Sequence, residues 1–378
     1  MAPPIRVAVY DKAFNFRGTI GNPGYVTLTL TFMAPGLGQF SIPNDHRRLG
    51  DLMTPGARVH FTDAKGDHLL AGSVRRWRGS GPEKSGSVEF DVIGDFSILQ
   101  TTLGWVVPGA AITEQGTAGT NWTMTGPAET VLKAAVTENA VNRLGLPITV
   151  PTTLGRGSTV SARLRFQTLH ERLILTEDGA GIIDSGIAAD IVPTEGGLLL
   201  DVWTPKTVLQ PINERSGIVK SWSYAYDHAK ITRVVVAGQG EGTLRLFRER
   251  VDTATEAELG EKREAFRDAR DSDDPTVLYA RADETITENA ARSGLSVEFG
   301  EAGNFQYGRQ FKVGDRVTLE VGGVSISDRL TECTLSWTKD GGFEARPRAG
   351  ARSEDPSRAL ADAVMRIARG IRNRNAEA

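Results

Sequence analysis

The chain has 378 residues, of which 39% are hydrophobic and 24% charged, a composition typical of a globular protein and a length sufficient for about two to four domains. Its formal net charge of −3 gives no general attraction to nucleic acid or anionic lipid, and no apolar run approaches the roughly 20 residues of a membrane span. The single cysteine, Cys333, rules out an intramolecular disulfide and a cysteine-based zinc site, and the first residues lack the pattern of a signal peptide, so we expect a soluble protein made in a cytoplasm.

Residues 1–107 are expected to form a β domain. Apolar and polar residues alternate with a period of two in four runs, Val7–Tyr10, Tyr25–Phe32, Ala57–Phe61 and Ser87–Ile93. Turns that contain glycine and proline separate these runs. Short and evenly spaced strands of this kind are typical of a barrel or a sandwich.

Residues 108–215 are expected to form a small α+β domain. An apolar stripe at helical spacing predicts a helix from Pro127 to Gly145. The spacing of Thr168 and Glu171 is that of a capping box, which predicts a second helix that ends at Gly179. Strands are expected at Ser161–Phe166, Gly181–Asp184 and Leu198–Trp203.

A second β domain is expected from two segments, residues 216–251 and 295–348, with strands at Ile231–Ala237 and Arg316–Val321. The charged segment between them, residues 252–294, is expected to be an insertion, because the strands on its two sides need one another. Within it, Thr253–Arg270 is expected to be helical and solvated. The predicted fold class is therefore α+β, mostly β.

An internal repeat connects the two β domains. Gly56–Phe61 is matched by Gly314–Leu319, and each copy continues with a glycine turn, a second strand with a tryptophan, a glycine hairpin and a third strand. The spacing from arginine to tryptophan is 19 residues between Arg58 and Trp77 and 21 between Arg316 and Trp337. Strand-turn-strand patterns also recur by chance, so duplication and coincidence are both open; duplication would give one chain two similar β domains.

No motif indicates catalysis, a metal or a cofactor. Gly238–Gly242 follows an apolar strand, but a strand rather than a helix is expected at Thr243–Phe247, so a turn or bulge is favoured over a dinucleotide-binding loop. Asp271–Asp274 lacks the glycine and the closing glutamate of a calcium loop. Unrelated surface or capping positions are expected for the five histidines, His46, His60, His68, His170 and His228. We expect no enzyme activity and no cofactor.

The last segment, residues 349–378, is expected to be a linker and a helix. Asp355 precedes Pro356 as an N-cap precedes a first helical residue, and the helix is expected to reach Asn373. An apolar seam at 4-3-4 spacing is formed by Leu360, Val364, Ile367 and Ile371. This seam is the candidate partner-binding site. It could pack on its own subunit, on symmetry mates or on another protein.

The sequence resembles the minor tail proteins of siphoviruses, especially those that infect actinobacteria, which form the baseplate hub. The resemblance rests on Val9–Asp11, Gly38–Pro43, Leu70–Gly72, Val234–Gly242 and Arg263–Arg270, and it spans nearly the whole chain. It implies two tail-tube-like β barrels per subunit, residues 1–107 and the discontinuous domain. It also implies a homotrimeric ring at the tail tip of the virion, assembled in the bacterial host cytoplasm, without catalytic residues.

The resemblance further implies the partners of such a ring. They are the hexameric tail tube and distal tail protein, the tape measure protein, and further minor tail proteins or a spike at the tip, with the ring as part of the DNA-ejection channel. Membrane and sequence-specific nucleic acid are not expected as partners. Two alternatives remain: a tail-associated cell-wall hydrolase, which needs a carboxylate pair or zinc site, and a carbohydrate-binding receptor protein, which needs exposed aromatic residues clustered in loops.

Overall fold

The computed structural model describes residues 4–82, 85–116, 119–176, 179–208, 212–213, 219–299, 307–321 and 324–350. The chain divides into two compact units. The first contains the described residues up to 223 together with 295–349, and the second is built around residues 224–294. Each unit has its own hydrophobic core.

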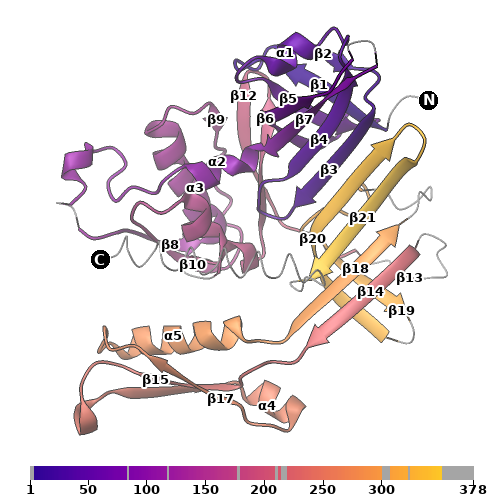
Figure 1. The fold of residues 1–378 in the computed structure, drawn as a ribbon. Coiled ribbons are helices and arrows are strands. Elements are labelled where there is room, and N and C mark those ends of the chain that lie inside the picture. The colour runs from indigo at the N-terminus through magenta and orange to yellow at the C-terminus, as the bar shows by residue number, and fades with distance from the viewer. Residues whose placement is uncertain are drawn as a thin grey trace. The chain divides into compact units, whose positions relative to one another are not determined.

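The first β region has the alternation that the sequence predicts. In β7 every second residue is buried, as are Val59 and Phe61 in β5, and the fully buried rings of Phe40 and Phe90 stack with their centroids 5.3 Å apart. The observed strands match the predicted runs to within two residues at each end. The elements of this region are β1 (Ile5–Tyr10), β2 (Phe16–Ile20), β3 (Tyr25–Thr31), β4 (Leu37–Pro43), α1 (Leu49–Met53), β5 (Arg58–Asp63), β6 (His68–Gly79) and β7 (Ser87–Gly94) (Figure 1).

The α+β region has a helix at the first predicted position and a short π-helical turn, His170–Ile174, at the second, which ends before the predicted Gly179. The first is α3 with a π-helical turn after it, and Glu129 in its first turn is fully buried with Lys133 and Arg156 as ion-pair partners. In the second, Thr168 and Glu171 exchange the two hydrogen bonds of a capping box, at 3.2 and 3.4 Å. The elements are α2 (Ile98–Thr101), β8 (Trp122–Pro127), α3 (Ala128–Val136), the π turns Thr137–Asn142 and His170–Ile174, β9 (Ile148–Thr149), β10 (Thr159–Leu164), β11 (Ala188–Thr194) and β12 (Gly197–Trp203).

One predicted strand of this region is wrong. Gly181–Asp184 forms a 3₁₀ turn over Ile182–Asp184, because Gly181 adopts a φ of +66° and leads the chain into a turn. Ile182 is buried, but in the turn.

The second β region joins the first in one sheet. Its strands are β13 (Ile212–Asn213), β14 (Val219–Asp227), β18 (Arg292–Phe299), β19 (Arg316–Val321), β20 (Val324–Thr338) and β21 (Gly342–Gly350). The order across the sheet is β14-β18-β21-β20-β3-β4-β7-β6-β5-β1-β2, with β19 paired to β20 and β13 to β19. The mostly β fold with helices is confirmed. Among the described residues the strands form an open sheet of 13, not two closed barrels.

The segment 252–294 contains two helices, α4 and α5, but it also contains the strand β17, and it belongs to a unit that starts at residue 224. This unit contains a three-stranded sheet in the order β16-β15-β17, and the stretch Thr253–Arg270 holds helix only as far as Leu259 before it becomes strand. Gly260, at φ +66°, ends that helix, and Glu264–Asp268 then pairs in parallel with β15. The elements are β15 (Arg233–Ala237), β16 (Phe247–Val251), α4 (Thr253–Leu259), β17 (Glu264–Asp268) and α5 (Pro275–Glu288).

Gly238–Gly242 also departs in detail from its prediction. A strand was expected directly after it, whereas Gly242–Leu244 is a 3₁₀ turn and β16 starts only at Phe247. No phosphate-binding helix follows the glycines, so the interpretation as a turn holds. The acidic segment Asp271–Asp274 leads into α5, and its last residue caps that helix: Asp274 accepts a hydrogen bond from the Thr276 amide at 2.8 Å.

The internal repeat has the same strand order in both copies. β5, β6 and β7 form an antiparallel meander, and so do β19, β20 and β21. In each copy the first half of the long middle strand pairs with the preceding strand and the second half with the following one. We call these the first meander (β5–β6–β7) and the second meander (β19–β20–β21).

The entry into each meander is also the same. Gly56 and Gly314 both have left-handed φ angles, +84° and +99°. The carbonyl of the next residue, Ala57 or Asp315, accepts a hydrogen bond from the bulge in the middle strand, from Val74 N at 2.9 Å or Leu330 N at 2.8 Å. The bulges lie between Val74 and Arg76 in β6 and between Leu330 and Glu332 in β20.

The two tryptophans of the repeat are not equivalent positions. Each faces a phenylalanine of the next strand, Trp77 with Phe90 and Trp337 with Phe343. Counted from the bulge, however, Trp77 corresponds to Cys333, because the second hairpin is longer. The similar spacings from arginine to tryptophan therefore align the ends of β6 and β20 that lead into the following hairpin, and not the bulges of these strands.

Candidate functional site

The predicted partner-binding seam lies outside the described residues. Leu360, Val364, Ile367 and Ile371 all belong to the segment after residue 350. The seam and its helix stay a prediction.

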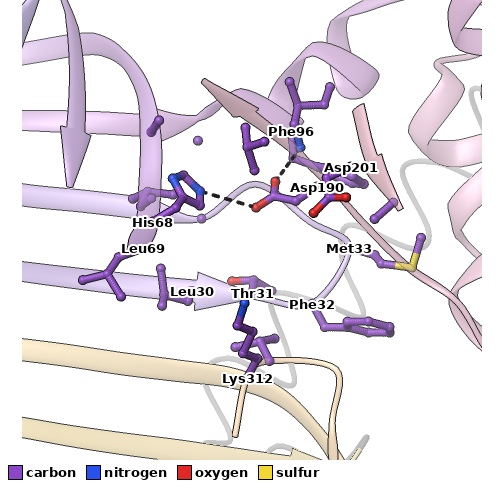
Figure 2. Close-up of a pocket in the computed structure, with 18 of the residues that line it drawn as sticks. Leu30, Thr31, Phe32, Met33, His68, Leu69, Phe96, Asp190, Asp201 and Lys312 are labelled. Atoms are coloured by element: carbon purple, nitrogen blue, oxygen red, sulfur yellow. Dashed lines mark hydrogen bonds and ion pairs between the residues drawn. The ribbon is translucent and has the colours of Figure 1, made fainter. Parts of the chain in front are cut away.

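A cavity of about 680 Å³ lies within the first unit. The end of β3, the start of β6, and β11 contribute to its lining, as do residues 307–315 (Figure 2). Charged side chains face one another across it, including Asp190, Asp201 and Lys312. The described lining residues include no serine and no cysteine.

Two histidines that were expected at unrelated positions form a pair beside this cavity. His60 Nε2 and His68 Nδ1 are 3.0 Å apart, and His68 Nε2 lies 3.9 Å from Asp190 Oδ2 (Figure 2). Burial, and then the charge of His68, lowers the pKa of His60 to about 4, so His60 is neutral at pH 7. The pair links the β5–β6 hairpin to β11 of the α+β region.

The sequence held a signal for this pair. His60 and His68 lie on either side of the short turn between β5 and β6, where the register sets Thr62 opposite His68 and His60 opposite Ala71. Thr62 and His60 are two residues apart on β5 and so share a face, and Thr62 lies opposite His68, which places both histidines on that face. Reading the histidines for helical ligand spacing alone missed them.

A second polar pair lies beside the first. Both carboxylate oxygens of Asp95 lie 2.5 Å from Arg58 Nη2, and the Asp95 side chain is 4% exposed. Burial raises the pKa of Asp95 to about 6, and the nearby Arg58 opposes that rise. Arg58 also lies over the Phe14 ring, 4.5 Å from its centroid, so the pair ties the start of β5 to two neighbouring segments.

The described residues contain no group of three or more His, Cys, Asp or Glu side chains that could hold a metal ion. The thiol of Cys333 is fully buried, and that burial raises its pKa, which disfavours the nucleophilic thiolate. His170 is buried as well, with Nε2 3.2 Å from the Met33 carbonyl. In the described part of the chain, no helix is both long and apolar enough to cross a membrane.

Exposed apolar surface is found on the sheet of the second unit. α5 packs on one face of this sheet through Leu278 and Ala282. On the other face, Phe247 is 49% exposed and Phe266 61%, and the Arg245 guanidinium lies about 6 Å from both rings. A sheet face of this composition is typical of a contact surface rather than of a catalytic centre.

Known proteins resemble this chain in sequence profile and in fold. Residues 6–351 match the family described as Siphovirus ReqiPepy6 Gp37-like protein. The 43 kDa tail protein of prophage MuSo2 from Shewanella oneidensis superposes with a TM-score of 0.57 at 13% identity, over 91% of this chain and 98% of that one. None of the curated proteins matches the sequence.

Two further tail proteins share the fold. Prophage tail protein gp18 from Listeria monocytogenes EGD-e has a TM-score of 0.55 at 11% identity, over 95% of this chain and 98% of that one. The tail protein from Neisseria meningitidis MC58 has a TM-score of 0.54 at 12% identity, over 92% and 96%. At such identities the likeness is one of fold, and it covers nearly the full length of each structure.

Proposed function

The chain belongs to the Siphovirus ReqiPepy6 Gp37-like protein family, a family of phage tail proteins, and we propose that it is the baseplate hub at the tail tip. In this role three copies form a ring that joins the hexameric tail tube and the distal tail protein to the proteins of the tip. The centre of the ring is part of the channel through which DNA leaves, and the tape measure protein ends there.

The observation that carries this proposal is the duplicated meander. Each chain has two meanders with the same strand order, the same left-handed glycine at the entry and a bulge at the same place in the middle strand. Three chains therefore offer six similar meanders around an axis. A threefold assembly with six similar positions can sit on a sixfold tube, which a ring of three single modules could not do.

We further propose that the chain has no catalytic activity of its own. The cavity beside His60 and His68 has charged and apolar walls, but no serine or cysteine nucleophile among its described lining residues. Its histidine pair and the Arg58–Asp95 pair hold segments of the first unit together. Purified chain should clear neither cell walls nor peptide or nucleic-acid substrates; metal-dependent clearing abolished by one acidic substitution would contradict this.

The oligomeric state of the purified full-length chain tests the ring. Native mass spectrometry should give a species of three times the 40.8 kDa chain mass over a range of micromolar concentrations. A monomer at all concentrations would refute the trimer. Antibody labelling of virions in electron micrographs should mark the tail tip, and labelling along the tube would refute the assigned position.

A further inference from the structure

The sheet of the second unit is covered on one face only. Val234 and Val236 of β15 are fully buried against α5 (Figure 1). Val235 between them lies on the other face and is partly exposed. The remaining described helix of this unit, α4, has no buried residue, so no described element of the unit packs on that face. We call it the open face; its residues alternate along the three strands and are Arg233, Val235, Ala237, Phe247, Glu249, Val251, Glu264, Phe266 and Asp268.

The centre of the open face is apolar. The register sets Phe266 opposite Val235 and Phe247 opposite Ala237. The Arg245 guanidinium lies between the two phenylalanine rings and donates to the Ala237 carbonyl at 3.1 Å, so it is held in place. β15 therefore has apolar residues on both of its sides. A strand with this pattern is typical of a sheet that is covered on both faces.

The charges around this apolar centre are mostly acidic. Glu249, Glu264 and Asp268 belong to the open face, and Arg233 is the basic residue among its members. Arg233 is already paired with Glu256 of α4, with 2.8 Å between nitrogen and oxygen. Glu264 has no ion-pair partner among the described residues. The open face therefore favours a cover that is apolar along its middle and basic at its sides.

The segment after β21 has this complementary pattern in its sequence. Residues 356–375 contain five arginines and a single acidic residue, Asp362, beside the predicted seam from Leu360 to Ile371. On a helix this seam would be about 16 Å long, at about 1.5 Å per residue. The five-residue strands of the sheet are also about 16 Å long, at about 3.3 Å per residue. An isolated helix of this length is marginal in water, more so with Gly370 in it, so it needs a surface to pack on.

We propose that the C-terminal segment of each chain folds as a helix on the open face of its own second unit. The seam packs on Val235, Phe247 and Phe266, and the arginines lie near the carboxylates at the sides. The sheet then has α5 on one face and the C-terminal helix on the other, an arrangement that buries both faces. Of the surfaces that could receive the seam, this selects one on the same subunit. The inference does not depend on the trimeric ring.

A thiol at position 235 measures whether the open face is covered. Val235→Cys is a small change at the centre of this face, and Cys333 is fully buried, so labelling of the folded chain reports position 235 alone. In this background, Val364→Asp together with Ile367→Asp places two carboxylates in the seam. These two changes should release the helix and speed the labelling of position 235 at least about tenfold, because access governs thiol reactivity.

A matched pair of substitutions on the same segment is the control. Ala359→Asp together with Met365→Asp adds the same two charges, at positions about 110° and 130° from the centre of the seam at about 100° per residue. The helix should stay in place and position 235 should stay slow to react. Equal labelling rates in all three chains, or equal acceleration by the two pairs, would overturn the inference.

A photo-crosslinker identifies what covers the face and needs no change in the C-terminal segment. With p-benzoylphenylalanine at position 266, irradiation of the full-length chain should give adducts with peptides of residues 356–375. These adducts should run at the mass of one chain on a denaturing gel. Ala280, exposed on α5 at the other side of the sheet, is the control position and should give few adducts with these peptides.

The other possible covers give different products. Adducts of residues 356–375 at the mass of two chains would show that another copy supplies the helix, and would overturn the assignment to the same chain. Adducts from position 266 to any other region, or equal adducts from positions 266 and 280, would overturn the docking itself. Neither result bears on the trimeric ring, which the native mass decides separately.

Discussion

The first and second meanders share a backbone but differ in the polar contacts that hold it. In the first, Arg58 starts β5 and forms a buried ion pair with Asp95. In the second, the equivalent Arg316 is exposed, and the buried Asp315 accepts hydrogen bonds from the Lys206 and Lys312 amides, both at 2.9 Å. The meander is therefore specified by strand alternation and by the glycine at its entry, and either polar arrangement is compatible with it.

The meanders also differ in what surrounds their middle strands. Cys333 in β20 is fully buried between β21 and β3, whereas Trp77 in β6 is half exposed at an edge that no other strand of the described residues covers. The same backbone position thus holds a small apolar residue where the sheet continues and a large aromatic one, with arginines on either side, where it stops. The difference indicates that the side chain at a given position of a meander depends more on the adjacent strands than on the meander itself.

The largest effect on stability is expected from the loss of the Arg58–Asp95 ion pair in the first meander. Arg58→Ala leaves the Asp95 carboxyl buried without its partner and should lower the free energy of unfolding by about 3–5 kcal/mol. Arg316→Ala is the matched change in the other copy and should cost less than about 0.5 kcal/mol, because its side chain is exposed. Urea denaturation measures both. Similar losses would show that the polar contacts of the two copies are equivalent after all.

A smaller effect is expected at the glycine that opens the second meander. Gly314 has φ +99°, and a Cβ atom there would lie 2.7 Å from the Phe32 ring, so Gly314→Ala should cost about 2–3 kcal/mol. Gly66→Ala, at a similar φ of +98° but with open space around it, should cost about 1 kcal/mol. Thermal unfolding distinguishes them; equal costs would mean that the close approach to Phe32 is unimportant.

The pH dependence of stability should carry the mark of Asp95. Its pKa is raised from 3.8 to about 6 by burial, so between these values the folded state binds more protons than the unfolded state. This group therefore makes stability fall as the pH rises through that window, by at most about 1.4 kcal/mol per pH unit. Asp95→Asn removes the titrating group, so its stability should fall less between pH 4 and pH 6. Parallel profiles for the variant and the unaltered chain would refute the assignment.

The last prediction concerns the reactivity of the Cys333 thiol, which reports whether this side chain is buried and leaves the fold unaltered. Cys333 has no exposed surface and its pKa is raised by burial, so a thiol reagent should modify it only after unfolding. In an Arg75→Cys variant, the added thiol on exposed β6 should react at once and Cys333 should remain unmodified. Fast reaction of Cys333 in the folded chain would show that β20 is not enclosed by its two neighbours.

Much of the fold followed from local pattern. Period-two alternation located β1, β3, β5 and β7, and the Thr168–Glu171 capping box located the start of the second helical turn, because each of these signals depends on residues close in sequence. The larger error came from a long-range partner. Glu264–Asp268 is a strand because β15 lies beside it, and nothing in that charged segment alone shows this.

The candidate site was harder to predict for the same reason. His60 and His68 meet across a hairpin, and Asp190 reaches His68 from β11, more than a hundred residues away. That one edge of β6 lacks a neighbour among the described strands became clear only from the equivalent half of β20, which β3 covers. The exposed arginines of β6 are visible in the sequence, but a charged surface strand is common and does not by itself mark a contact.

Electron cryomicroscopy of the purified full-length chain tests the central claim most directly. We predict a closed ring that contains three copies and, around its axis, six lobes of similar size. A ring of three copies in which the two meanders of each chain occupy unrelated positions, or single unassembled chains in every class, would contradict it.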